Sequence, residues 1–308
     1  MPAGRDDIIL HHYDASPFSQ KVRAFLGLKQ AAWMSVRTPN MLPKPDLVPL
    51  TGGYRRAPVL QVGADVYIDS QLALAEVERR LPSPKANIGP AFAVNLWSDR
   101  LLFQATVAII FGRLGDRVDP AFMADREKLS GRPFDPAAMA AASGPMRGQW
   151  RGHAGFLDQA LAGAGAPFLA GETPTLIDIA AHMNFWWLGG VFPDLLDELT
   201  GGLDHVRAWH GRMGEIGQGR RVEITGQDAL DVARATGPAP ALPHDPHEVS
   251  GFSPGDPVIV SADDYGRDPI AGRLVSADAH RLTLARDTAD LGRLHLHFPR
   301  VGYIITRG

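Results

Sequence analysis

The pattern of hydrophobic and polar positions in the first eighty residues predicts a small domain of alternating strands and helices. Short apolar runs mark buried strands, and an apolar face that recurs every three to four residues marks each helix. Gly63 and Ala64 separate two of the strands by two residues, the spacing of a hairpin. The expected elements are a strand at 8–13, a helix at 17–28, a strand around 33–36, strands at 57–62 and 65–69, and a helix at 70–81.

The middle of the chain has a different pattern. After the linker-like stretch PSPKANIGP at 82–90, we find no convincing alternating strand between 91 and 236, only helical segments separated by Gly and Pro. This region is therefore predicted to be an all-α domain. The helices are expected near 91–114, 121–129, 145–163, 175–189, 203–217 and 226–236.

The last part of the chain returns to strand-like alternation. A Pro-rich stretch at 237–256 is followed by five short alternating runs, PVIVSA, AGRLVSA, RLTLAR, RLHLHF and GYIITR. Five strands in about 55 residues suggest a small β-barrel of SH3-like size. Because so small a module buries little surface, we expect it to lean on the helical domain.

The chain is thus predicted to have three parts, as its length also suggests. The order strand, helix, strand, hairpin, helix resembles that of a thioredoxin-like α/β domain. The predicted fold class is α/β plus all-α, ending in a small all-β module. The predicted boundaries are 1–82 for the thioredoxin-like domain, 90–236 for the helical domain, 237–251 for a linker and 252–308 for the β module.

Composition and charge exclude several kinds of function. The net charge of -3 provides no basic field for nucleic acid, and no apolar run approaches the ~20 residues needed to span a bilayer. The acidic N-terminus does not resemble a secretory signal, so a cytoplasmic protein is expected. The absence of cysteine excludes disulfides, cysteine nucleophiles and thiolate metal sites. His295 and His297 share one face of a strand, but no third ligand is evident, so no metal site is predicted.

The start of the first helix poses a question about chemistry. Pro17 suits the first helical position, which makes Ser16 the N-cap, and capping alone would explain this serine. A hydroxyl that accepts a hydrogen bond from the helix still has a proton to donate, so Ser16 could also bind a thiolate at the helix tip. Tyr13, at the end of the first strand, is a rival hydroxyl, although it could equally be a packed aromatic.

Four stretches in order along the first 220 residues resemble the glutathione transferase family. Singly each is a weak signal, and together they make the resemblance specific. They are Ser16-Pro17-Phe18-Ser19, similar to the active-site tip of the tau and omega classes; Ala57-Pro58-Val59-Leu60, similar to the cis-proline segment; Asp69-Ser70, similar to the Glu/Asp-Ser pair; and PFLAGETPTLIDIA at 167–180, similar to the helical-domain signature with Thr175 and Asp178 as a capping pair.

The resemblance implies a glutathione site in the first domain. It makes Pro58 a cis proline that lets the backbone of Val59 pair with the tripeptide, although an ordinary trans proline at a strand edge is the alternative. Ser70 would hold the γ-glutamyl carboxylate and Asp69 would face the γ-glutamyl amine, unless Asp69 is only a helix cap. Phe18 and Lys44 complete the predicted contacts, with Lys44 reaching the glycyl carboxylate.

The function implied is conjugation of the glutathione thiolate, formed opposite Ser16, to a hydrophobic electrophile. Trp97 and Phe103 are the candidates for the electrophile pocket, though aromatics at helical spacing also build cores. Glutathione would be a co-substrate, no other cofactor is implied, and the family resemblance implies a homodimer. The alternative is a non-catalytic protein of this fold whose C-terminal β module mediates interactions, because the resemblance says nothing of residues after about 240.

Overall fold

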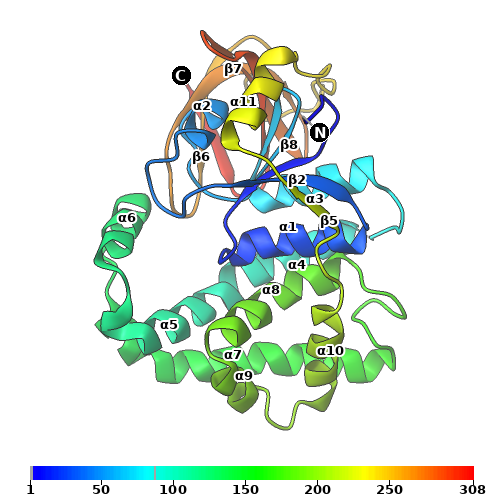
Figure 1. Ribbon diagram of the computed structural model, residues 1–308, viewed down its shortest axis with the longest axis vertical. Helices are drawn as coiled ribbons and strands as arrows, with labels where there is room; N and C mark the ends of the chain where they lie inside the picture. Colours follow the sequence, from blue (N-terminus) through cyan, green and yellow to red (C-terminus); the bar gives the residue numbers. More distant parts are fainter. Residues whose placement is uncertain (1–2, 87) are drawn as a thin grey trace.

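The computed structural model describes residues 3–86 and 88–308. Figure 1 shows a helical region at one end of the molecule and a sheet region at the other, with both chain termini in the sheet region. The sheet has ten strands in the order β10-β6-β7-β8-β9-β4-β3-β1-β2-β5, so strands from the beginning and the end of the chain form one continuous structure.

The N-terminal domain has the predicted thioredoxin-like order. β1 and β2 are parallel, β3 is antiparallel to β1, and the β3–β4 hairpin turns at Gly63, whose φ of 60° suits glycine. The elements are β1 (Ile9–His12), α1 (Pro17–Leu28), β2 (Ala32–Arg37), the short α2 (Leu47–Thr51), β3 (Val59–Val62), β4 (Asp65–Ile68) and α3 (Asp69–Arg80).

Both faces of this part of the sheet are buried, which explains its nearly continuous apolar strands. On β3, Leu60 packs into the core shared with α1, α3 and the helical region. Its neighbour Val59 packs into a second core on the opposite face. The sheet is therefore the wall between two cores, and α1 and α3 lie between it and the helical bundle (Figure 1).

The helical region matches the predicted segments with three differences. The helix predicted at 91–114 begins at Ile88, inside the predicted linker at 82–90, and a π turn at Ser98–Leu102 divides it. The predicted start of the helix at 145 is wrong: the helix begins at Pro136, capped by the side chain of Asp135, and Pro145 lies inside it. A short helix at 193–199 was not predicted. The elements are α4 (Ile88–Trp97), a π turn (Ser98–Leu102), α5 (Phe103–Leu114), a 3-10 turn (Gly115–Arg117), α6 (Pro120–Ser130), α7 (Pro136–Ala164), α8 (Leu176–Val191), α9 (Pro193–Leu199) and α10 (Asp204–Gly214).

The chain then returns to the sheet earlier than the pattern indicated. The expectation of no strand between 91 and 236 is wrong at β5 (Arg220–Glu223), which pairs in parallel with β2 at the edge of the sheet. α11 (Gly226–Ala235) follows and packs Ala229 and Val232 against Ile9 and Val36. β5 has a polar, mostly exposed sequence, so hydrophobic alternation could not predict it, although its main chain pairs with β2.

The five predicted C-terminal strands are all present, in the order β10-β6-β7-β8-β9, and they form one sheet with the N-terminal strands. β9 pairs in parallel with β4, so the module continues the N-terminal sheet and leaves β10 and β5 as its two ends. This pairing satisfies the backbone groups that β4 would otherwise expose at an edge. The strands are β6 (Pro257–Ala262), β7 (Ile270–Ala277), β8 (Arg281–Thr288), β9 (Gly292–Pro299) and β10 (Tyr303–Arg307).

The β module therefore packs mainly against the N-terminal domain. The expectation that it would pack against the helical domain is wrong. Leu282, Leu296 and Phe298 share one core with Val59 and Val66 of the N-terminal hairpin. Its contacts with the helical region come from the loop after β6, where the Asp263 carboxylate lies 2.7 Å from Arg100 and the Gly266 N–H donates to the Leu129 carbonyl.

Candidate functional site

The N-terminus of α1 is built by Ser16, as the sequence predicts. Ser16 has an extended backbone, and its Oγ accepts a hydrogen bond from the Ser19 N–H at 3.1 Å, while Pro17 occupies the first helical position. Ser16 is only 1% exposed. Among the described residues no acceptor lies within hydrogen-bond distance of the Ser16 hydroxyl hydrogen, so this hydrogen is available for donation.

Tyr13 and Lys44 lie next to each other. The ammonium of Lys44 lies over the Tyr13 ring, 5.8 Å from its centre. Lys44 is buried, in contrast to an ordinary loop lysine, and burial together with the nearby Arg126 guanidinium lowers its pKa to about 8. Neither residue is on the wall of the pocket described below.

The segment before β3 has the backbone that the sequence predicts, because the Ala57–Pro58 peptide bond is cis. Val59 follows it, fully buried, and pairs with His11 on β1 and Ile68 on β4. The predicted cis proline is thus confirmed, and it lies at the end of β3 that faces the start of α1.

Asp69 begins α3 with a left-handed backbone, φ 75°, which is uncommon for a residue other than glycine. Its Oδ1 accepts hydrogen bonds from the Gln71 N–H at 3.0 Å and the Ser70 hydroxyl at 3.4 Å. Its Oδ2 accepts one from the Tyr303 hydroxyl at 3.1 Å. A side chain from the last strand of the protein therefore reaches the start of α3.

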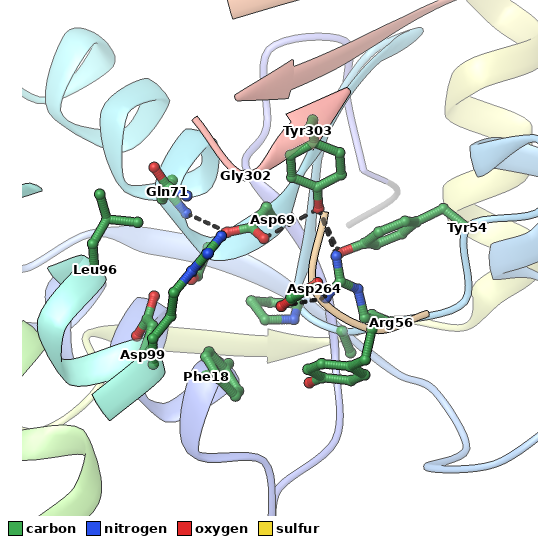
Figure 2. A pocket seen from close by; sticks show the side chains of 15 residues that line it. Phe18, Tyr54, Arg56, Asp69, Gln71, Leu96, Asp99, Asp264, Gly302 and Tyr303 are labelled. Carbon is green, nitrogen blue, oxygen red and sulfur yellow. Dashed lines mark hydrogen bonds and ion pairs between the residues drawn. The ribbon is translucent and has the colours of Figure 1, made fainter. Parts of the chain in front are cut away.

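One pocket collects residues from all three parts of the chain (Figure 2). Four of the predicted glutathione-binding residues line it, namely Phe18, Pro58, Asp69 and Ser70. The predicted residues Ser16, Tyr13, Lys44, Val59, Trp97 and Phe103 are not on its wall. The rest of the lining is Tyr54, Arg56, Ala57, Gln71, Leu96, Asp99, Arg100, Asp264, Tyr265, Gly302 and Tyr303.

Arg56 is at the centre of the part that sequence reasoning missed. Its guanidinium lies over the rings of Tyr54, Tyr265 and Tyr303, at 5.2, 5.1 and 5.9 Å from their centres. It also forms an ion pair with Asp264 at 3.1 Å. Tyr54 and Arg56 directly precede the cis-proline segment, so their position in the sequence could have identified them as site residues. The sequence gives no such indication for the residues of the β module, because about 200 residues or more separate them from Arg56.

A buried ion pair forms the pocket wall on the side of the helical region. Lys21 of α1 donates to Asp99 at 2.6 Å and to the side chain of Asn95, also at 2.6 Å. Burial raises the pKa of Asp99, and the Lys21 ammonium opposes that rise. The pair joins α1 to the helical region next to Phe18.

The two predicted electrophile-pocket aromatics lie in different places. Trp97 donates its indole N–H to His153 of α7 at 3.1 Å, so its polar edge faces the helical bundle. Phe103 packs edge-on against Phe18, with ring centres 4.8 Å apart, and stacks on Trp187. Of the two, Phe103 is the one whose ring packs against an aromatic side chain of the pocket wall.

The described ranges also bear on metal binding and on membrane crossing. There, no group of three or more His, Cys, Asp or Glu side chains is arranged to hold a metal ion. His297 is hydrogen-bonded to Asp65 and to Thr283. Within the same residues, none of the helices has both the length and the apolar character needed to cross a membrane.

Comparison with known proteins shows a similar domain and a similar overall fold. Residues 10–85 match the profile described as glutathione S-transferase, N-terminal domain. The crystal structure of a GST-like protein from Pseudomonas syringae is 29% identical, with a TM-score of 0.81, and the match covers 98% of this chain and 100% of that one. The C-terminal strands therefore fall within the matched part. The search of curated proteins found no match.

More distant structures share the fold. FzlA from C. crescentus is 20% identical with a TM-score of 0.51, over 68% of this chain and 88% of that one. The tau class glutathione S-transferase MiGSTU from mango, Mangifera indica, is 14% identical with a TM-score of 0.53, over 69% and 90%. Residues 10–85 thus match a glutathione S-transferase N-terminal domain, and the chain as a whole, its C-terminal β module included, has a GST-like fold.

Proposed function

We propose that the protein binds glutathione in the pocket between α1, the cis-proline segment and α3, and conjugates its thiolate to an electrophilic small molecule. The observation that carries the proposal is the convergence of Phe18, Pro58, Asp69 and Ser70, from three separate segments, on one pocket wall. In this arrangement the start of α3 receives the γ-glutamyl group, and the start of α1 faces the thiol.

The Ser16 hydroxyl is the proposed donor to the thiolate. A cysteinyl thiol has a pKa near 8.5, and lowering it by about two units needs roughly 3 kcal/mol. A hydrogen bond to a charged group contributes ~1.5 to 3 kcal/mol and the helix N-terminus ~0.3 to 1 more. The free hydrogen of Ser16 supports this role. The thiolate sulfur then forms a bond to the electrophile, and the leaving group departs with the bonding electrons.

The alternative, a non-catalytic protein of this fold, is favoured by the burial of Ser16, which is 1% exposed. A hydroxyl that a ligand cannot reach caps the helix and does nothing more. The presence of the C-terminal extension can be explained without a binding partner, because the extension pairs with β4 and continues the sheet. The homodimer and the cytoplasmic location stay predictions.

The test is a pH titration of the ultraviolet thiolate absorbance of glutathione mixed with the protein, together with Ser16→Ala and Ser19→Ala. Ser19 is the matched control, because its buried Oγ, one turn into the same helix, has no hydrogen-bond partner within the described residues. We expect a bound thiol titrating well below its free pKa, normal behaviour in Ser19→Ala, and tenfold or greater loss of conjugation in Ser16→Ala. Binding without any thiolate would leave the non-catalytic alternative, and no binding would refute the glutathione site.

A further inference from the structure

The C-terminal module places one polar group directly on a predicted glutathione anchor. The turn at 300–302 brings the start of β10 beside α3, where the Gln71 side chain donates to the Val301 carbonyl at 3.4 Å. Tyr303 follows, 7% exposed, and its hydroxyl lies 3.1 Å from Asp69 Oδ2. Figure 2 shows this hydroxyl between Asp69 on one side and Tyr54 and Arg56 on the other.

The neighbours of the Tyr303 hydroxyl determine where its hydrogen points. Arg56 Nη2 donates to this oxygen at 3.0 Å, and guanidinium groups only donate. The Asp69 carboxylate only accepts. Burial raises the pKa of Tyr303, so its hydroxyl keeps its single hydrogen, which goes to Asp69. The Tyr54 hydroxyl lies 3.2 Å from the same oxygen.

Asp69 is consequently held by three donors. A carboxylate has about four acceptor positions. The Gln71 N–H and the Ser70 hydroxyl use Oδ1, and the Tyr303 hydroxyl uses one position on Oδ2. One position on Oδ2 remains, next to the pocket that Asp69 lines. A ligand ammonium group is the donor that such a position suits best.

We propose that Tyr303 is a positioning residue of the ligand site, which fixes the Asp69 carboxylate so that its remaining acceptor position binds the α-amino group of the γ-glutamyl moiety. The inference rests on the proposed glutathione site and adds to it a residue from outside the transferase-like domains. The β module thereby determines selectivity for the amino group and is part of the ligand site.

The test compares two peptides on three proteins by calorimetry. The peptides are glutathione and its glutaryl analogue, which lacks only the α-amino group. The proteins are wild type, Tyr303→Phe and Tyr67→Phe. Tyr67 is the matched control, because it is a buried tyrosine of β4 outside the pocket lining and stacks on His297. We expect wild type and Tyr67→Phe to bind glutathione about tenfold or more tightly than the analogue. In Tyr303→Phe this preference should largely disappear.

The ratio of the two affinities distinguishes a loss of the positioning role from a general loss of stability, because destabilisation changes both affinities together. Gly302→Ala is a second variant in case Tyr303→Phe does not fold. It keeps the hydroxyl but opposes the backbone φ of 92° at residue 302, so it displaces Tyr303 and should also reduce the preference. An undiminished preference in a folded variant would overturn the role of Tyr303 alone. A wild type that binds neither peptide would overturn the glutathione site itself.

Discussion

The carboxylate of Asp65 on β4 accepts a hydrogen bond from the ring of His297 on β9, with 2.8 Å between Oδ1 and Nε2. Its other oxygen accepts from the Ala239 N–H at 2.7 Å, and the second ring nitrogen of His297 lies 3.1 Å from the Thr283 hydroxyl. All these side chains are buried, and the network spans the parallel β4–β9 pairing. The N-terminal domain and the β module are joined here by polar contacts as well as by their shared core.

Asp65→Ala should lower the free energy of unfolding by about 3 kcal/mol, because it leaves a buried ring N–H and a backbone N–H unpaired. The measurement is denaturant unfolding. Asp287→Ala is the control, since Asp287 pairs with Arg293 on the surface, where both side chains are more than half exposed. That change should cost less than about 1 kcal/mol. Equal effects would contradict the structural role of the junction.

Removal of residues 252–308 should abolish folding of the remaining chain and not merely remove an appended module. The deletion uncovers the edge of β4 and takes away more than half of the core that contains Leu50, Val59 and Val66. Circular dichroism of the truncated chain would measure this. A truncated protein that keeps its helices and melts cooperatively would show that the module is dispensable.

Leu296→Ala tests the same coupling without a deletion. Leu296 is fully buried on β9, so the variant should lose roughly 2 to 5 kcal/mol in one cooperative transition observed for both the N-terminal domain and the module. Ile304→Ala, at a half-exposed position of β10, should change stability by less than about 0.5 kcal/mol. Two separate transitions in Leu296→Ala would mean that the sheet unfolds in independent parts.

Acid should destabilise the protein through buried histidines. Burial lowers the pKa of His11 to about 4 and that of His182 to about 3. Burial, with Arg23 and Arg221 nearby, lowers that of His12 to about 3. Between pH 6.5 and about 4 the unfolded chain binds these protons and the folded chain does not, so stability falls as pH falls.

The effect should be measurable as the change in unfolding free energy from pH 7 to pH 5. Each of the three histidines contributes on the order of 2 kcal/mol over that interval. His182→Asn should reduce the pH dependence by about the contribution of one such histidine, on the order of 2 kcal/mol, whereas His205→Asn, at an exposed position, should not. A stability that is flat between pH 7 and pH 5 would contradict the neutral buried state.

The two residues of the capping pair at the start of α8 should contribute unequally to the free energy of unfolding. Asp178 is fully buried and accepts from the Thr175 N–H, the Leu169 N–H and the Trp209 indole, each within 2.9 Å. Asp178→Ala should therefore cost on the order of 3 kcal/mol or more, because three buried donors lose their acceptor. Thr175→Ala should cost about 1 kcal/mol, as for a simple cap. Thermal unfolding of both variants would show whether Asp178 is the larger contributor.

The predicted features that the structure confirms depend on neighbouring residues in the sequence. The Ser16 cap, the hairpin at Gly63, the capping pair at 175–178 and the five C-terminal strands each follow from a short pattern of turn, cap and apolar positions. The cis Ala57–Pro58 bond came from resemblance to a family, because an isolated X-Pro bond is usually trans.

What the sequence could not determine is how distant segments pair. β5 forms main-chain hydrogen bonds that need no particular side chains, and β9 pairs with β4, whose edge would otherwise be unpaired. Hydrophobic periodicity gives the face of each strand but not its neighbour.

The same limit applies to the candidate site, where some residues could be predicted from local motifs and others could not. The sequence by itself determined the residues that short motifs contribute, at the starts of α1 and α3 and before β3. Only the tertiary structure placed Tyr303 against Asp69 and Arg56, and it kept Lys44 and Trp97 off the pocket wall. Hydrogen bonds between side chains more than 200 residues apart depend on the packing of the whole sheet, which no local pattern encodes.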